Sequence, residues 1–150
     1  MEIEARRYIE NAIRRIRRSE ISSESGSHLA GVVGKAAQKY ERLMRQKFDQ
    51  VLRGCHVDYD SQIRPHIKGE TLLSKLTLGQ IAFGFEILAN ISPICFHKHL
   101  LDNVREQSFI EMVKSINKKW INVKHGNGIS SAEALKQMTD MLQTIDWIKA

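Results

Sequence analysis

The sequence predicts an all-α fold, a bundle of four to six helices, and three observations lead to this prediction. Apolar residues recur at helical spacing in several segments. Three of these segments begin with the pattern of a helix-capping box. No segment shows the alternation, bounded by turn signals, that is typical of a β-strand. With 150 residues, 42% of them hydrophobic, residues 1–150 can bury about two thirds of their unfolded surface as a single domain.

The first helix is predicted over residues 2–20, amphipathic and rich in arginine. Its apolar stripe consists of Ala5, Ile9, Ala12, Ile13 and Ile16. The remaining surface carries Arg6, Arg7, Arg14, Arg15, Arg17 and Arg18. The segment 19–27, SEISSESGS, has the composition of a turn that ends this helix. A solvated polar face is the ordinary role of such a charge pattern, and contact with a phosphate backbone is the alternative.

The longest helix is predicted over residues 28–53, with Gly54 as the stop signal. Its first half, Ala30 to Ala37, is rich in alanine and glycine, which permits close crossing by another helix. Residues 54–76 are predicted as a long loop that can contain one short turn. No period is sustained there, and Pro65 disfavours a helical conformation of Arg64.

Later helices are predicted near residues 78–91, 109–124 and 131–149. Each follows a capping-box pattern, in which a hydroxyl and a carboxamide or carboxylate three residues on satisfy each other's backbone N–H groups. The three pairs are Thr77 with Gln80, Ser108 with Glu111, and Ser130 with Glu133. Ser92 and Pro93 are a plausible N-cap and first-turn pair for a short helix through Leu101.

Composition favours a cytoplasmic protein with acidic partners. The net charge of +6 favours phosphate-bearing molecules. The chain has no run of about 18 apolar residues and no signal-peptide pattern, and Met1 at the start of a helix fits a natural N-terminus. The arginine helix lacks Trp or Phe to anchor it at a membrane surface, so no membrane partner is expected.

The cysteines and nearby histidines do not predict a metal site. The two cysteines, Cys55 and Cys95, are typical of a reducing compartment, although one disulfide remains open. With His56, His97 and His99 they suggest a sulfur–nitrogen site, but the spacing fits no standard zinc pattern. No metal and no cofactor are therefore expected.

The candidate site lies in the stretch 117–133, NKKWINVKHGNGISSAE. On a helix, Lys118, Asn122 and His125 share one face, and Gly126 is the expected left-handed residue just past the helix end. A histidine beside lysines can act as general acid or base toward a phosphodiester, with the 2′-hydroxyl of RNA as nucleophile. The ordinary alternative is a helix cap on a solvated face.

This turn resembles one found in the HEPN superfamily (higher eukaryotes and prokaryotes nucleotide-binding), especially in its abortive-infection and other defence members. The shared features are the NxxHG turn at Asn122 to Gly126, the capped final helix, and KLTLGQIAFGFEIL at 75–88, which is similar to a family helix start. The resemblance is best over residues 75–149. It implies a HEPN-like all-α bundle, usually homodimeric, whose ribonuclease members cut RNA without metal through an Arg-x4–6-His motif.

His125 matches the family histidine, but no arginine stands at the allowed spacing. Those positions hold Lys118, Lys119 and Trp120. Lysine keeps the charge and loses the planar, bidentate grip on phosphate. If the site is catalytic, the resemblance implies His125 as acid/base, Lys118 or Lys119 as the phosphate-binding cation, and Asn122 as an orienting partner. The predicted RNA contacts are Arg14, Arg15, Arg17, Arg18 and Lys124.

Two functions remain open. The first is an RNA-interacting domain of a prokaryotic defence or toxin–antitoxin system, either an altered metal-independent endoribonuclease or a non-catalytic RNA binder. Its expected partners are a second copy of the chain and an antitoxin or other protein. The second is a non-catalytic helical module, in which the small-residue segment Ala30 to Ala37 builds an oligomer or docks a partner.

Overall fold

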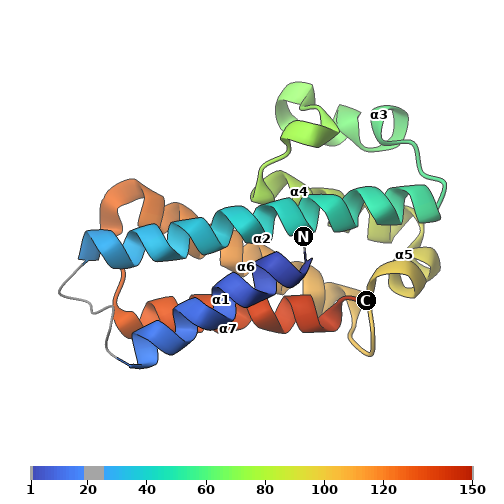
Figure 1. Ribbon diagram of the computed structural model, residues 1–150. Coiled ribbons are helices and arrows are strands. Elements are labelled where there is room, and N and C mark those ends of the chain that lie inside the picture. The colour runs from blue at the N-terminus through green and yellow to red at the C-terminus, as the bar shows by residue number, and fades with distance from the viewer. Residues whose placement is uncertain (1, 19–25, 150) are drawn as a thin grey trace.

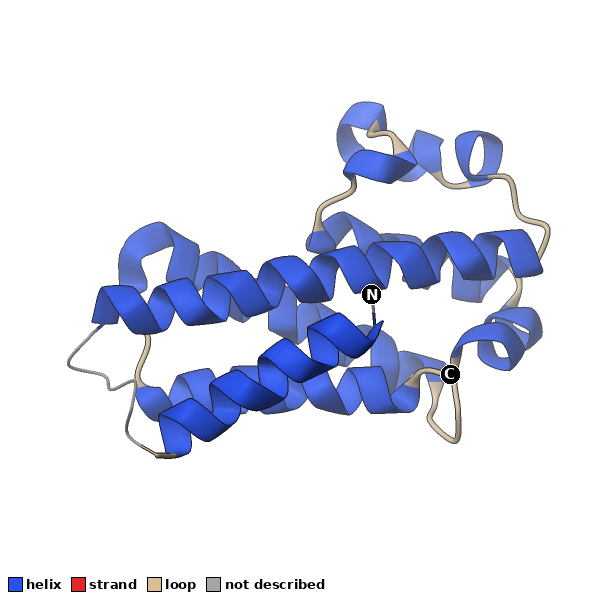
Figure 2. Ribbon diagram, in the orientation of Figure 1, coloured by secondary structure: helices blue, strands red, loops and turns tan. Residues whose placement is uncertain are grey.

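The computed structural model describes residues 2–18 and 26–149, and within these ranges it contains helices and no β-strand (Figures 1 and 2). The six longer helices are α1 (Glu2–Arg17), α2 (Gly26–Gly54), α4 (Leu78–Ile91), α5 (Pro93–Leu100), α6 (Glu106–Asn122) and α7 (Ser131–Trp147). The shorter elements are α3 (Tyr59–Gln62), the 3-10 turns η2 (Arg64–His66), η3 (Lys68–Glu70) and η4 (Leu73–Lys75), and the π-helical turn η5 (Val123–Asn127). The prediction of an all-α helical bundle is confirmed.

Helix α2 runs along the molecule, and helices α1, α4, α5 and α7 pack against it (Figure 1). It has 29 residues and is the longest helix in the described ranges, as predicted. Gly26 and Ser27, predicted as part of a turn, instead open this helix, and the rest of that turn lies outside the described residues. Helices α1 and α7 are antiparallel, since Arg6 near the start of α1 lies 2.7 Å from Asp146 near the end of α7. None of the described helices has the length and apolar character needed to cross a bilayer.

The core is continuous from α1 to α7 and contains a cluster of aromatic rings. The ring of Phe85 on α4 makes edge contacts with Phe48, Phe96 and Phe109, at centroid distances of 5.3, 5.9 and 5.4 Å. These rings come from α2, α5 and α6, so Phe85 joins four helices. Farther along α2, the buried Tyr40 hydroxyl lies 2.7 Å from Thr144 on α7, and burial raises the pKa of Tyr40.

The prediction of a long loop over residues 54–76 is wrong, because this segment folds into α3 and three 3-10 turns. Its apolar side chains drive the folding: Val57, Tyr59, Ile63 and Ile67 are buried in the common core. They follow no helical or strand period, because Ile63 and Ile67 lie at the junctions between the short turns, where the chain changes direction, and the 3-10 turns themselves contain no buried residue. Pro65 lies within the 3-10 turn η2, so it does not prevent local helical structure there.

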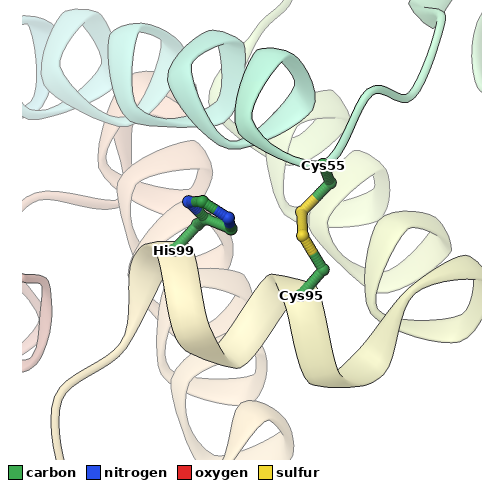
Figure 3. A group of neighbouring side chains, drawn as sticks. All are labelled: Cys55, Cys95 and His99. Atoms are coloured by element: carbon green, nitrogen blue, oxygen red, sulfur yellow. A yellow bond between two sulfur atoms is a disulfide. The ribbon is translucent and has the colours of Figure 1, made fainter.

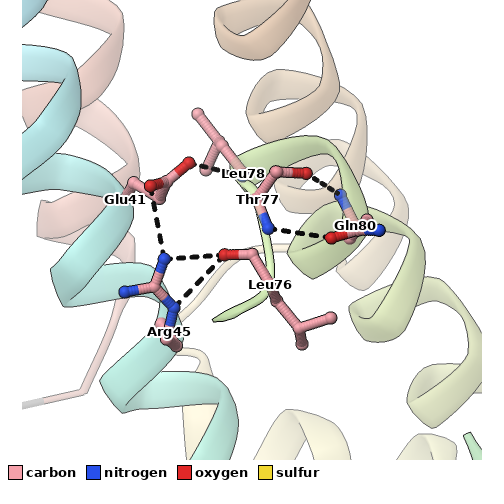
Figure 4. Close-up of polar contacts among 6 residues, drawn as sticks. All are labelled: Glu41, Arg45, Leu76, Thr77, Leu78 and Gln80. Atoms are coloured by element: carbon pink, nitrogen blue, oxygen red, sulfur yellow. Dashed lines mark hydrogen bonds and ion pairs between the residues drawn. The ribbon is translucent and has the colours of Figure 1, made fainter. Parts of the chain in front are cut away.

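Polar contacts attach the end of this segment to α2 (Figure 4). Arg45 donates hydrogen bonds to the Leu76 carbonyl oxygen, with Nη2 at 2.7 Å and Nε at 3.2 Å. One oxygen of Glu41 accepts from the backbone N–H of Leu78 at 2.7 Å, and the other lies 3.3 Å from Arg45. Together these residues satisfy backbone groups on both sides of the α4 start, where a helix leaves its first N–H groups unpaired.

Two of the three predicted capping boxes are present. Thr77 caps α4 with Gln80 as its partner, and Ser130 caps α7 with Glu133. The prediction for Ser108 is wrong, because α6 starts at Glu106 and Phe109 already donates to the Arg105 carbonyl oxygen at 3.1 Å.

Contacts before and after Ser108 account for the earlier start of α6. His97 Nδ1 lies 2.9 Å from the Glu106 carboxylate, which ties the first turn to α5. Glu111 accepts a hydrogen bond from Gln107 at 3.0 Å rather than from the backbone of Ser108. The predicted N-cap Ser92 and first-turn Pro93 do precede α5, although Ser92 makes no side-chain capping bond.

Alanine substitutions should show that Ser130 caps a helix and that Ser108 does not. Ser130→Ala removes the acceptor for the Glu133 N–H and should lower the free energy of unfolding by about 1 kcal/mol. Ser108→Ala, at an exposed site inside the first turn of α6, should change it by less than about 0.5 kcal/mol. Urea denaturation of the two variants measures both values. Equal losses would contradict the assignment of the helix starts.

Candidate nucleic-acid interface

The predicted site lies where α6 ends, in a turn whose backbone requires glycine. Gly126 has φ of +82° and Gly128 has φ of +70°, both in the left-handed region. Gly126 therefore has the conformation predicted for it. Open space surrounds both positions, so the backbone dihedral and not crowding selects glycine there. His125 precedes this reversal and its side chain is exposed.

The two candidate phosphate-binding lysines have different environments. Lys118 and Asn122 are exposed, one helical turn apart on α6. Lys119 faces α7, with its Nζ 3.8 Å from a carboxylate oxygen of Asp140. The next cation, Lys124, places its Nζ 6.0 Å from the centroid of the Trp120 ring while remaining exposed. Lys118 is therefore the better placed of the first two lysines for a phosphate in solvent.

Asp140 is responsible for the different environments of Lys118 and Lys119, and it was not identified from the sequence. It is only 5% exposed, and besides Lys119 it pairs with Lys136 at 2.7 Å. A buried carboxylate is costly unless cations or hydrogen-bond donors balance its charge, and the two lysines meet that need. A lysine at position 119 accordingly has a structural partner within the chain. The i,i+4 spacing of Lys136 and Asp140 was visible in the sequence, but the approach of Lys119 was not.

A surface pocket of about 460 Å³ lies between the end of α6 and the start of α7. Its lining residues are Lys119, Asn122, Val123, Gly128, Ile129, Ala132, Glu133, Lys136 and Gln137. Of the four predicted catalytic residues, Lys119 and Asn122 line this pocket, whereas Lys118 and His125 do not. Gln137 is fixed by a hydrogen bond of 2.8 Å from its Nε2 to the Ile116 carbonyl oxygen. The predicted residues are thus divided between a pocket and the open surface beside it.

The predicted arginine contacts are exposed at the C-terminal end of α1. Arg14, Arg15, Arg17 and Arg18 all lie on this surface. Arg14 bonds to Asn11, a neutral side chain, so its charge is not cancelled by that contact. Nearer the start of the helix, Arg6 pairs with Glu10 and Asp146, at 3.9 and 2.7 Å. Arg6 is therefore paired with carboxylates, whereas the contact of Arg14 is with a neutral side chain.

The two basic clusters lie at the same end of the bundle. Figure 1 shows the end of α1, the start of α2 and the turn between α6 and α7 together at the left of the molecule. The contact between Trp120 and α2 agrees, because a Cβ atom added at Gly34 would lie 2.7 Å from the Trp120 ring. We call the exposed residues Arg14, Arg15, Arg17, Arg18, Lys118, Lys124 and His125 the basic end.

The contact between Gly34 and Trp120 shows how the small-residue segment of α2 is used. Gly34 receives the Trp120 ring of the same chain, and Val33, Ala36 and Ala37 are buried in the core. Close packing along this segment is as predicted, and much of it occurs within one chain. Gly31 is exposed and has open space around it.

Comparison of the chain with protein-family models, with curated proteins and with solved structures found no match.

Proposed function

We propose that this chain is a HEPN-like helical domain that binds RNA at its basic end. The observation that supports this most directly is that the end of α1 and the α6–α7 turn lie at the same end of the bundle, so exposed cations from two distant segments share that end. Phosphate contacts by lysine and arginine provide most of the affinity of sequence-independent nucleic-acid binding. Asp140, the buried acid at this end, has its charge balanced by Lys119 and Lys136.

A metal-independent cleavage reaction is the finer proposal at the same surface. His125 would accept the proton of a 2′-hydroxyl as that oxygen attacks the adjacent phosphorus. The 5′-oxygen would leave and take a proton from water, producing a 2′,3′-cyclic phosphate, while Lys118 neutralised a non-bridging oxygen. Asn122, one turn from Lys118, would orient the phosphate. This assigns Lys118 and not Lys119, because Lys119 faces Asp140.

The HEPN resemblance further suggests that the chain forms a homodimer and acts in prokaryotic defence, and we include both in the proposal. Part of the motif has a local structural role in this chain: Thr77 and Gln80 form the capping box of α4. Helix initiation is therefore a sufficient explanation for Thr77 and Gln80. The functional side of the HEPN resemblance then depends on the histidine turn alone. A non-catalytic module that oligomerises through α2 is the competing function, and the burial of Val33, Ala36 and Ala37 within one chain leaves less surface for it.

RNA binding should depend on charge at the basic end and not on charge elsewhere. Reversal of Arg17 and Lys118 to Glu should weaken binding to single-stranded RNA by at least about tenfold. The slope of log affinity against log salt should become shallower by about one for each phosphate that the variant no longer binds. Reversal of the exposed Lys75 and Lys98 to Glu makes the same change in net charge away from this end. Equal losses in both double variants would contradict a localised site.

Cleavage is tested with the same RNA in EDTA, using wild type, His125→Ala and His66→Ala. His66 is an exposed histidine on η2 and serves as the control. Wild type and the control should leave 2′,3′-cyclic phosphate ends, and His125→Ala should leave the RNA intact. Localised binding without cleavage by any of the three would reject the reaction and retain the RNA-binding function. Absence of both would favour the competing module.

A further inference from the structure

Two cysteines and a histidine that are far apart in the sequence meet at the C-terminal end of α2. Cys55 follows Gly54, the last residue of α2, and Cys95 and His99 lie one turn apart on α5. Figure 3 shows the three side chains converging between these helices. A ring nitrogen of His99 and the two sulfur atoms all lie within 4.8 Å of one another. In the structure the sulfur atoms form a disulfide, with the two Cα atoms 5.8 Å apart.

We propose that the reduced form of this cluster binds a zinc ion through Cys55, Cys95 and His99. Tetrahedral zinc with bonds of about 2.3 Å to sulfur and 2.0 Å to nitrogen places its ligand atoms about 3.5 to 3.8 Å apart. Once the S–S bond is reduced, side-chain rotations would bring the three ligand atoms, which lie within 4.8 Å of one another, to those separations. A set of two thiolates and one imidazole is the donor type that zinc prefers. Because two thiolates balance the charge of Zn²⁺, the loaded site is neutral, which suits the half-buried cysteines.

The surrounding backbone is shaped for the His99 ring. A Cβ atom at Gly54 would lie 2.9 Å from His99 Nδ1, so only glycine at this position lets the imidazole lie against the end of α2. The last carbonyl groups of a helix also carry partial negative charge, which favours a cation. His97, two residues away on α5, lies against Glu106 instead and takes no part in the cluster. With three protein ligands and His99 exposed, the fourth position of the metal would be open to water or to a partner group.

Oxidation state decides between the two forms. A dithiol reductant that transfers two electrons to the Cys55–Cys95 bond becomes a disulfide itself, and each cysteine sulfur takes up one proton. Zinc binding then releases those two protons, because the thiolate is the metal ligand. In the disulfide no thiolate remains, so the metal cannot be held by sulfur. The chain would therefore bind zinc in a reducing compartment and release it on oxidation.

Cobalt, a spectroscopic substitute for zinc, tests the site directly. Protein reduced with a phosphine and titrated anaerobically should bind one Co²⁺ with cobalt–thiolate charge-transfer absorption, and one equivalent of Zn²⁺ should remove that absorption. Oxidised protein should show none. His99→Asn should weaken Zn²⁺ binding at least about tenfold in competition with a chromophoric chelator. His97→Asn, on the same helix, should bind as wild type does.

Two results would overturn the proposal. One is reduced wild-type protein that keeps its helical circular dichroism and shows no thiolate absorption with Co²⁺. The other is equal Zn²⁺ affinity in His99→Asn and wild type, which would remove the histidine from the site. Because folding is checked on the reduced wild type, the result does not depend on the folding of a cysteine variant. RNA binding at the opposite end of the bundle should be the same in His99→Asn, so this test is independent of the proposed function.

Discussion

Phe48→Ala should lower the free energy of unfolding by about 3 to 5 kcal/mol, the cost of removing a fully buried aromatic ring. Phe48 is completely buried, with its ring 5.3 Å from that of Phe85 and 6.3 Å from that of Tyr59. It therefore joins α2 to α4 and to the segment that follows α2. Proteins of this size have only about 5 to 15 kcal/mol of stability, so the melting temperature should fall by roughly 10 °C.

Phe83→Ala is the matched control for this loss. Phe83 lies on α4 near Phe85, but its side chain is 42% exposed. Its truncation should cost less than about 1 kcal/mol, as for surface substitutions in general. Guanidinium denaturation of the two variants gives both values. If the variants lose the same stability, the aromatic cluster does not have the central role assigned to it.

Gly84 allows the Phe48 prediction to be tested in a double-mutant cycle. A Cβ atom at Gly84 would lie 2.7 Å from the tip of the Phe48 ring, so Gly84→Ala should cost about 1 to 3 kcal/mol in the wild-type background. In the Phe48→Ala background the ring is gone, and the substitution should be neutral or stabilising because alanine favours helices. A strong coupling between the two sites is thus expected. Additive losses would contradict the contact.

Reduction of the Cys55–Cys95 disulfide should be the second large loss of stability. The bond closes a loop with a sequence separation of 40 residues. The chain-entropy relation for a loop of that length gives about 4 kcal/mol of stabilisation, through restriction of the unfolded chain. Urea denaturation with and without a phosphine reductant, in EDTA to exclude metal, measures the difference. The Cys55→Ser/Cys95→Ser double variant is the control, and reductant should leave its stability unchanged.

Zinc should recover part of this loss if the cluster binds it. A ligand at about 100 times its Kd stabilises the folded state by about 2.7 kcal/mol. Reduced wild type should gain that stability on addition of Zn²⁺, whereas the serine double variant should gain none. For the disulfide itself, equal stability of the reduced and oxidised proteins in EDTA would contradict the expected restriction of the unfolded chain by the cross-link.

Local sequence patterns were enough to predict most of the long helices. The stripe of Ala5, Ile9, Ala12, Ile13 and Ile16 is buried as its spacing predicted. The caps at Thr77 and Ser130 and the left-handed Gly126 also occur where the sequence placed them. These features depend on hydrogen bonds and side chains within a few residues, so their physical causes are present in the local sequence.

The candidate site was predicted only in part, because contacts with distant residues determine how its side chains are used. Lys118 and Lys119 are adjacent and chemically identical, yet only Lys119 lies against Asp140, which approaches from α7. The placement of the arginines of α1 and the histidine turn at the same end of the bundle likewise depends on the antiparallel packing of α1 on α7. Spacing along one helix contains no information about either contact.

Local sequence patterns are sufficient to predict the all-α class, the principal helices, two of the three capping boxes and the exposed basic turn. The start of α6, the folding of residues 55–76 and the proximity of Cys55, Cys95 and His99 depend on packing between distant segments. The physical reason is the range of the interactions. A helix forms its backbone hydrogen bonds over four residues. A cross-link, a buried ion pair or an aromatic cluster forms only when packing brings together side chains that are distant in the sequence.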